Sequence, residues 1–448
     1  MRIYRKGCLF LFFGILNLVP AAFAQATKHV ILISIDGLRP EFYLDASWPA
    51  VNMQQLKTKG VYARKVKSVF PSFTYPSHVA MLTGALPARS GIYYNAPFEP
   101  EGATGKWSWF LKDIKVPTIW NGIKAAGLTS AAVEWPVSVG EDITYNIPEI
   151  WDPKKPEDRI SETRKYATKG LIEEIELNAT GKLDGENMNE EHLSLDENAG
   201  RMAAYIFKKY KPGLLAVHFA SVDGAQHEQG RGGDKVKQAV ATVDRAIGNI
   251  LEAIEIAKMS DSTSVIITGD HGFTDMKQVL RPNIWLKQAK LIGEGKNWNV
   301  KFQPAGGSAF LYVQNKKDEA MVGKVKNILT QLPADIQKYF TVYDRNKLDA
   351  MGADSNAVLA LAAMPGVVFG GGTEGEVLSV IKGGGHHGYD PEMPEMFTGF
   401  IGYGAGFRSG ANIEQMSVKD IAPLIATLLG LKFKSQDGIL YPGLVTGN

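Results

Sequence analysis

Short apolar runs alternate with longer amphipathic stretches along most of this 448-residue chain. Apolar residues recur at helical spacing from Val236 to Ile254, after Asp234, and a similar stripe runs from Leu195 to Tyr210. The apolar runs between such stripes have the length of strands and cover residues 30–35, 131–135, 214–222, 265–268 and 397–403. Strands that alternate with helices predict βαβ units, and therefore an α/β fold with a largely parallel sheet.

Two segments depart from this alternation. Residues 147–191 are polar and interrupted by proline and glycine, which indicates an excursion over the surface. Residues 281–384 have a mixed pattern with two glycine clusters, and candidate metal ligands lie on both sides of them. We interpret this segment as an inserted cap subdomain, which divides the catalytic core into residues 25–280 and 385–448.

The N-terminus has the pattern of a secretory signal peptide. Arg2, Arg5 and Lys6 precede an apolar run at 8–19, and Ala22-Phe23-Ala24 is a small-x-small cleavage site. The run is shorter than the roughly 20 residues that a membrane-spanning helix needs. We therefore expect a signal peptide over residues 1–24, cleavage near Ala24 and export to the periplasm or the medium. An uncleaved anchor is the alternative.

Removal of that peptide changes how charge and cysteine content are interpreted. It takes three of the 49 basic residues and leaves 46 against 47 acidic ones, a net charge near −1. This balance gives no electrostatic case for binding a nucleic-acid polymer or a membrane surface. Cys8 is the only cysteine and has no lipid-attachment pattern around it, so no stable membrane anchor is implied. The mature chain then has no disulfide, and a large core must stabilise it.

Three aspartates follow predicted strands. Asp36 ends the run ILISI, Asp223 ends the run LLAVHFASV, and Asp270 follows VIITG. In an open α/β sheet, binding sites form outside the carboxyl ends of the strands. Any one of these residues could be a structural aspartate. Three at three strand exits predict that the carboxylates meet in one crevice.

Three histidines accompany these aspartates. His227 lies four residues after Asp223, His271 directly follows Asp270, and His387 lies in a glycine-rich loop. Mixed sites of aspartate and histidine favour zinc, whereas magnesium and calcium prefer oxygen ligands alone. Six such residues suffice for two three-ligand zinc sites, each with a position left for substrate.

Thr74 is the candidate nucleophile. Pro76 suits the first turn of a helix, so Thr74 lies just before a helix predicted at 75–82. Free N–H groups and the helix dipole favour an anion at that position. On local sequence alone, a threonine that only caps the helix is the stronger interpretation.

The motifs together resemble those of a known family. In chain order they are IDGLRPEFY, PSFTYPSHVAMLTG, GIYYN, DGAQH, TGDHG and GHHGYD. This set is similar to the nucleotide pyrophosphatase/phosphodiesterase family of the alkaline phosphatase superfamily, over about residues 30–390. TGDHG is typical of the superfamily, and PSFTYPSH followed by Asn95 points to the phosphodiesterase branch. The resemblance implies an alkaline-phosphatase-like three-layer sandwich, with a mostly parallel sheet and helices on both faces.

The resemblance also implies roles for the candidate residues. One Zn²⁺ ion would be held by Asp223, His227 and His387. The other would be held by Asp36, Asp270 and His271, together with Thr74 Oγ. Asn95 would donate a hydrogen bond to a non-bridging phosphoryl oxygen, beside the Thr74 backbone N–H.

These roles imply a two-zinc phosphodiesterase or nucleotide pyrophosphatase, a phosphoric diester hydrolase that acts through a phosphothreonine intermediate. A phosphomonoesterase or phosphonate hydrolase of the alkaline phosphatase type is the alternative. The neutral amide of Asn95 suits the single charge of a diester, and no arginine closely follows Thr74. A catalytically silent metal-binding receptor would usually have lost the nucleophile or a ligand, and here all of them are present. A phosphomutase acts on cytosolic sugar phosphates, so the export signal argues against it.

The remaining histidines receive other interpretations. His78 lies four residues after Thr74 on the same helix face, so we expect it to support the site or to pack beside it. His386 precedes His387, but the register Gly-x-His-Gly-Tyr-Asp selects His387 as the ligand. We interpret the others as ordinary structural residues: His29, His192 and His218. Nucleotides, glycerophosphodiesters and phospholipid head groups all stay open as small-molecule substrates, and no pattern indicates an oligomeric state.

Overall fold

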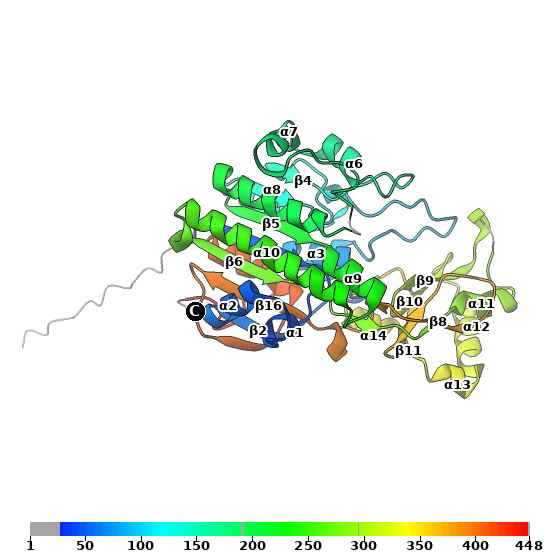
Figure 1. Ribbon diagram of the computed structural model, residues 1–448. Coiled ribbons are helices and arrows are strands. Elements are labelled where there is room, and N and C mark those ends of the chain that lie inside the picture. Colours follow the sequence, from blue (N-terminus) through cyan, green and yellow to red (C-terminus); the bar gives the residue numbers. More distant parts are fainter. Residues whose placement is uncertain (1–26, 190–191, 294, 447–448) are drawn as a thin grey trace, which may run out of the picture.

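The computed structural model describes residues 27–189, 192–293 and 295–446. The predicted signal peptide at 1–24 lies outside these residues. A large layered body holds the central sheet, and a smaller group of strands and helices lies at one end of it (Figure 1). No helix in the described part of the chain is both long enough and apolar enough to cross a membrane.

The central sheet has eight strands in the order β17-β2-β16-β6-β1-β5-β3-β4. In chain order they are β1 (His29–Ile35), β2 (Val61–Lys67), β3 (Ser130–Val133), β4 (Tyr145–Ile147), β5 (Leu214–Phe219), β6 (Thr263–Thr268), β16 (Thr398–Gly404) and β17 (Asn412–Ser417). β1 pairs in parallel with β5 and β6, whereas β16 runs antiparallel to both of its neighbours. The predicted α/β fold with a mostly parallel sheet is therefore confirmed.

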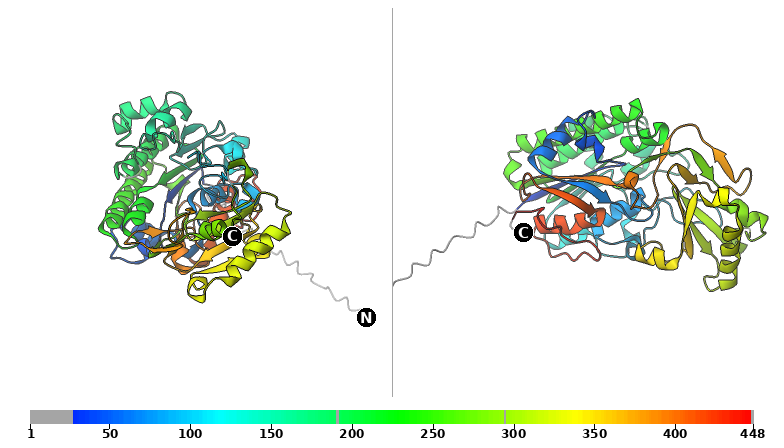
Figure 2. Two further views of the ribbon diagram at one scale, coloured as in Figure 1. Left: turned by 90° about the vertical axis from the view of Figure 1, so that its right-hand side faces the viewer. Right: turned by 90° about the horizontal axis from the view of Figure 1, so that it is seen from below.

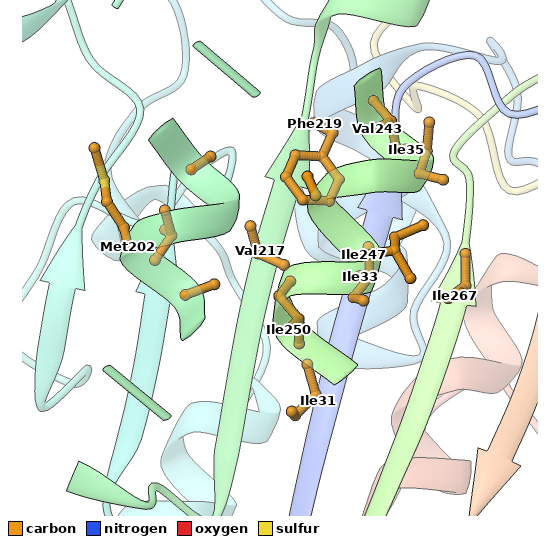
Figure 3. Close-up of a cluster of buried hydrophobic side chains, with 14 of the residues drawn as sticks. Ile31, Ile33, Ile35, Met202, Val217, Phe219, Val243, Ile247, Ile250 and Ile267 are labelled. Atoms are coloured by element: carbon orange, nitrogen blue, oxygen red, sulfur yellow. The ribbon is translucent and has the colours of Figure 1, made fainter. Parts of the chain in front are cut away.

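Helices cover both faces of this sheet because its central strands are apolar on both sides. Ile31, Ile33 and Ile35 of β1 pack on one face, against α8 (Ser194–Tyr210) and α10 (Asp234–Ile256). Figure 3 shows these isoleucines beside Val243 and Ile247 of α10. The alternate β1 residues face the second core, which includes residues of α3 (Thr74–Thr83), α5 (Ile119–Ala125) and α15 (Ile421–Leu428). Such double coverage explains the continuous apolar runs in the sequence.

A second group of sheets lies beyond one end of the central sheet (Figure 2, right). Its largest sheet has the order β11-β12-β10-β9, with β9 (Val300–Ala305), β10 (Ser308–Val313), β11 (Phe340–Tyr343) and β12 (Leu359–Ala363). α11 (Pro282–Gln288) and α12 (Glu319–Gln331) contribute to a separate apolar cluster here. A three-stranded sheet of β8 (Gln278–Leu280), β13 (Val367–Phe369) and β14 (Leu378–Val380) completes the group. The bounds 281 and 384 for the subdomain stay a prediction.

The structure differs from the sequence expectations in several segments. The predicted strand at 214–222 ends at Phe219, and residues from Ser221 onward form α9 (Ser221–Gln229). Residues 147–191 do more than cross the surface, because they form α6 (Arg159–Tyr166) and α7 (Leu171–Ile175), whose few apolar side chains are buried. α10 begins at Asp234 itself and has Gly233 as its N-cap. Ser417 and Asp420 form a capping box just before α15.

The buried carboxylate of Asp244 joins the helices α10 and α2 (Val51–Lys59). Asp244 of α10 accepts hydrogen bonds from the backbone N–H groups of Asn52 and Met53, at the start of α2. Both bonds measure 2.9 Å, and Asp244 is 5% exposed.

We expect Asp244→Ala to lower the free energy of unfolding by about 2–3 kcal/mol, because two buried N–H groups lose their acceptor. Chemical denaturation followed by circular dichroism measures this loss. Glu252→Ala, at an exposed position of the same helix, is the matched control and should change stability by less than about 0.5 kcal/mol. Equal stability of the two variants would contradict the proposed coupling of α2 to α10.

Candidate metal centre

The three aspartates lie at one edge of the central sheet. Asp36 directly follows β1, and Asp270 comes two residues after β6. Asp223 is in the first turn of α9, which begins two residues after β5. The three strands are parallel neighbours, so their carboxyl ends open on the same crevice.

Asp36, Asp270 and His271 form one compact buried group, with ligand atoms within 4.8 Å of one another. His271 Nε2 lies 3.3 Å from Asp36 Oδ1 and 3.1 Å from Asp270 Oδ2. The backbone N–H of Gly37 donates to the other oxygen of Asp270, at 3.0 Å. Gly37 has a φ of +67°, and a Cβ atom there would lie 2.7 Å from the amide of Gln226. The glycine of the IDG motif thus permits the close approach of α9 to the exit of β1.

Asp223, His227 and His387 lie beside this first group. Asp223 Oδ2 is 3.2 Å from His227 Nε2, and Asp223 Oδ1 is 3.8 Å from His387 Nε2. The rings of His387 and His271 stack with centroids 3.7 Å apart. Asp223, His271 and His387 also meet the 4.8 Å criterion as a group, so all six predicted residues converge on one place.

A short strand pair brings the two histidine loops together. β7 (Thr274–Asp275) follows the GDHG motif, and β15 (Gly385–His386) precedes His387. The two strands pair antiparallel, with His386 opposite Thr274. This pairing places His387 near His271 although 116 positions of sequence separate them.

Backbone carbonyl groups fix which nitrogen of each histidine faces the crevice. The Nδ1 atoms of His227, His271 and His387 lie 3.1, 3.1 and 2.9 Å from the carbonyl oxygens of Gly385, Gly272 and Ser72, respectively. A carbonyl oxygen can only accept, so each neutral ring carries its proton on Nδ1. The lone pair of each Nε2 is then available to a metal ion, as is usual for metal-binding histidines.

His386 has the opposite arrangement. His227, His386 and His387 also bring ligand atoms within 4.8 Å of one another. The Nδ1 atom of His386 accepts a hydrogen bond from the backbone N–H of His387, at 2.9 Å. The proton of neutral His386 is therefore on Nε2, which makes that atom a donor and not a ligand. This geometry favours His387 over His386 as the metal-binding residue.

The buried polar atoms fit a cation. Asp36 Oδ1, Asp223 Oδ1, Asp270 Oδ2 and His271 Nε2 are buried and have no hydrogen-bond partner among the described residues. Burial, followed by the charges of Asp270 and Asp223, raises the pKa of Asp36 well above its usual range. Burial also raises the pKa of Asp270. Carboxylates in this state are stabilised by bound positive charge, and the oxygen and nitrogen donor set suits zinc.

Thr74 and Asn95 lie beside the metal ligands. Thr74 is the first residue of α3, whereas the sequence predicted it one position before the helix. Asn95 Oδ1 accepts a hydrogen bond from the Tyr75 backbone N–H, at 3.0 Å. The amide oxygen of Asn95 is thereby committed to the helix start, which leaves Nδ2 as the atom that can donate to a ligand.

One cavity of about 920 Å³ is lined by most of the candidate residues, whereas Asp270 and His271 are fully buried and are not part of its lining. Its lining includes the candidate residues Asp36, Thr74, Asn95, Asp223, His227 and His387, together with Trp107, Glu149, His218 and Lys235. None of the described residues from 281–384 contributes to this lining. Lys235 is the single lysine or arginine in it, and its Nζ atom lies 2.5 and 2.6 Å from the two carboxylate oxygens of Glu228. A second cavity, near α2 and the end of β16, holds none of the candidate residues.

Two residues of the site were missed by sequence reasoning. His218 of β5 was interpreted as an ordinary structural residue, yet its Nε2 lies 3.1 Å from Asp36 Oδ2. Glu134 lies at the end of β3 with a φ of +51°, and its buried Oε1 has no hydrogen-bond partner among the described residues. The available signal for both was a polar residue inside an otherwise apolar run.

Comparison with known proteins gives a family. A family model described as type I phosphodiesterase / nucleotide pyrophosphatase matches residues 30–390. Ectonucleotide pyrophosphatase/phosphodiesterase family member 7 of Rattus norvegicus is 24% identical over 438 residues, which cover 95% of this chain and 89% of the relative. Bis(5'-adenosyl)-triphosphatase enpp4 of Mus musculus is 23% identical over 430 residues, which cover 93% of this chain and 80% of the relative.

Solved structures agree with the fold. Human ectonucleotide pyrophosphatase/phosphodiesterase 5 aligns with a TM-score of 0.67 at 19% identity, over 92% of this chain and 97% of that one. A murine structure of the same protein, described as inactive and in complex with AMP, aligns with the same score, identity and coverage. At this identity the likeness establishes the alkaline-phosphatase-like fold.

Glu134 predicts a pH dependence of stability. Burial, followed by the charge of Glu149, raises the pKa of Glu134 from 4.5 to about 8. Between these pH values the folded protein binds more protons than the unfolded chain. The contribution of Glu134 to the free energy of unfolding therefore falls as pH rises from about 4.5 to about 8, by at most about 1.4 kcal/mol per pH unit. The glutamine of Glu134→Gln does not titrate, so this variant should not lose stability over the interval. Its free energy of unfolding, relative to that of wild type, should therefore be larger at pH 8 than at pH 5.

Urea unfolding of both proteins at pH 5, 6.5 and 8, with the same chelator present, measures the difference. Glu141→Gln, at an exposed position, is the control and should follow wild type. If the difference in free energy of unfolding between Glu134→Gln and wild type does not change with pH, Glu134 does not titrate in this interval.

Proposed function

We propose, from the premise that this chain belongs to the type I phosphodiesterase / nucleotide pyrophosphatase family, that it hydrolyses phosphodiester or pyrophosphate bonds with Thr74 as nucleophile. One observation carries this proposal. A threonine at a helix N-terminus shares a single cavity with overlapping groups of aspartate and histidine that suit two metal ions. Displacement at phosphorus is the reaction for which such a set is suited.

Two zinc ions are the cofactors in this proposal. Asp36, Asp270 and His271 would hold one ion together with Thr74 Oγ, and Asp223, His227 and His387 would hold the other. Zinc at these positions supplies charge neutralisation for the attacking and leaving oxygens and lowers the pKa of a nearby hydroxyl.

The protein groups then have distinct tasks. Thr74 Oγ attacks phosphorus, the bond from phosphorus to the leaving oxygen breaks, and a phosphothreonine forms. The Asn95 Nδ2 and the Thr74 backbone N–H donate to a non-bridging oxygen, and the N-terminus of α3 favours its negative charge. A water molecule then attacks the same phosphorus, which releases a phosphomonoester and restores Thr74.

The relatives support a nucleotide-type substrate. One relative is named a bis(5'-adenosyl)-triphosphatase, which implies cleavage of a phosphoanhydride chain between two nucleosides. The murine structural neighbour in complex with AMP is an inactive variant in which a threonine is replaced by alanine. We extend both features to this chain: a small nucleotide or related phosphodiester as substrate, and a catalytic threonine.

The charge of the cavity favours a diester over a monoester. A monoester dianion needs more positive charge than a diester monoanion. Lys235, the single cation of the described lining, is already paired with Glu228. Asn95 offers a neutral donor instead. A phosphomonoesterase or phosphonate hydrolase of the alkaline phosphatase type stays the second candidate.

Two further expectations belong to this proposal. Export to the periplasm or the medium after cleavage near Ala24 agrees with an enzyme that meets its substrate outside the cytosol. The division into core segments 25–280 and 385–448, with an insertion at 281–384, agrees with the separate sheets and apolar cluster of the inserted part.

Thr74→Ala should lower kcat by a factor on the order of 10³ or more, because the side chain loses the attacking oxygen. Thr74→Ser keeps a hydroxyl and should retain a measurable part of the activity. Steady-state hydrolysis of bis(4-nitrophenyl) phosphate measures both, and thermal unfolding verifies that each variant is folded. Near-wild-type turnover by folded Thr74→Ala would exclude Thr74 as the nucleophile.

The wild-type enzyme should prefer bis(4-nitrophenyl) phosphate over 4-nitrophenyl phosphate by at least about tenfold in kcat/KM, because Asn95 and a paired Lys235 suit a single negative charge. Both substrates release the same chromophore, so one absorbance assay compares them. A preference for the monoester of tenfold or more would favour the second candidate function.

A further inference from the structure

We propose that His218 is a positioning residue for the metal centre: its Nε2 is hydrogen-bonded to one oxygen of Asp36, so that the other oxygen is presented to the metal position. This inference rests on the metal assignment made in the proposed function. It adds a residue that the predicted ligand set does not include and that the sequence alone did not indicate.

The two oxygens of the Asp36 carboxylate have different neighbours. Oδ2 lies 3.1 Å from His218 Nε2, whereas Oδ1 lies 3.3 Å from His271 Nε2, a candidate ligand atom. Oδ1 is buried and has no hydrogen-bond partner among the described residues. One oxygen is therefore held by His218, and the other faces the crevice. A carbonyl oxygen can only accept, so the contact of His218 Nδ1 with the Glu134 carbonyl places a proton on Nδ1, and the hydrogen bond between Nε2 and Asp36 Oδ2 contains a second proton that the two residues share.

The sheet determines this contact. β5 and β1 pair in parallel, with Ser34 opposite His218 and Ile35 opposite Phe219. Asp36 is the residue after β1, so its side chain starts one step beyond the end of the paired register. His218 is 4% exposed and Asp36 is 5% exposed, so their hydrogen bond is largely shielded from solvent although both residues line the cavity.

The His218 ring is itself held in place. Its Nδ1 lies 3.2 Å from the carbonyl oxygen of Glu134, in the backbone stretch that has a positive φ. The ring of His78 packs edge-on against it at a centroid distance of 4.6 Å. His78 is anchored in turn by the Thr74 carbonyl oxygen, 2.8 Å from its Nδ1, and packs on Trp135. The strained stretch after β3 thus supports His218 from behind.

Two other roles fit these contacts less well. His218 is absent from every group of described residues whose ligand atoms lie within 4.8 Å, so it is not itself placed as a ligand. A histidine buried only for packing needs no short contact with a carboxylate. Hydrogen-bond partners of metal ligands commonly change metal affinity by about 10- to 100-fold when they are removed, and this is the effect expected here.

The test measures metal binding directly and does not depend on activity. Apoprotein is titrated with Co²⁺, whose visible absorption reports coordination geometry, and Zn²⁺ affinity is measured by competition with a chromophoric chelator. His218→Gln and His218→Asn form a matched polar pair. The glutamine amide nitrogen reaches the Nε2 position and can donate to Asp36, whereas the shorter asparagine reaches only the Nδ1 position.

Asp36→Asn identifies which of the two metal-binding steps in the titration belongs to the site of Asp36, Asp270 and His271, called the Asp36 step below. His29→Asn is the control, because His29 is also buried on this sheet but lies at the opposite end of β1, bonded to the Pro212 carbonyl oxygen. We expect His218→Asn to weaken the Asp36 step about 10- to 100-fold and to change its Co²⁺ spectrum. His218→Gln should stay much closer to wild type, and His29→Asn should bind both ions normally.

The outcomes separate this inference from the proposed function. If wild type binds two ions and Asp36→Asn loses one, the metal assignment stands. Wild-type affinity and spectrum for His218→Asn would then overturn the role of His218, as would equal weakening by the glutamine and asparagine variants. If Asp36→Asn leaves metal binding unchanged, the metal assignment fails and this inference fails with it.

Discussion

The meeting of three carboxylates in one crevice, two of them buried and one partly exposed, is the constraint on which the rest of the site depends. Asp36, Asp223 and Asp270 lie at the exits of neighbouring parallel strands, and burial and mutual repulsion raise the pKa of Asp36 well above its usual range. Such a group is stable only where positive charge neutralises it. The surrounding histidines are arranged accordingly, because backbone carbonyl oxygens accept hydrogen bonds from the Nδ1–H groups and each Nε2 lone pair then faces inward.

Rigid elements hold this arrangement at the required precision. β1 and β6 lie in the middle of an eight-stranded sheet with helices on both faces, so the positions of Asp36 and Asp270 follow from strand register. The loops are less rigid and are tied to one another instead. β7 pairs with β15, and the Ser72 carbonyl oxygen lies 2.9 Å from His387 Nδ1, which joins the loop before Thr74 to the loop of His387. A ligand-binding geometry built this way tolerates little displacement.

The six candidate residues that the structure brings together could be found from the sequence because they lie in short local motifs, the aspartates at or just after strand exits and His387 in a glycine-rich loop. The sequence could not predict His218 or the Lys235–Glu228 pair, since those roles arise from contacts between segments that local patterns do not relate. His218 contacts Asp36 only because β5 pairs with β1 in a particular register. The strands β2 and β17 were missed for a related reason. β17 is an edge strand and β2 lies next to it, and both interleave polar residues with apolar ones, so neither has the continuous apolar run of a central strand.

The segment at 281–384 contacts the loops that carry site residues, but none of its described residues lines the cavity itself. Tyr94, next to Asn95, has its hydroxyl 2.7 Å from that of Tyr312 in β10, and Phe98 stacks on the same tyrosine. At the other loop, Ser308 donates to the Gly388 carbonyl oxygen, at 2.6 Å. β10 therefore contacts both the loop of Asn95 and the loop of His387. Because these two loops come from distant parts of the core, contacts with the same strand help to fix the position of Asn95 relative to His387.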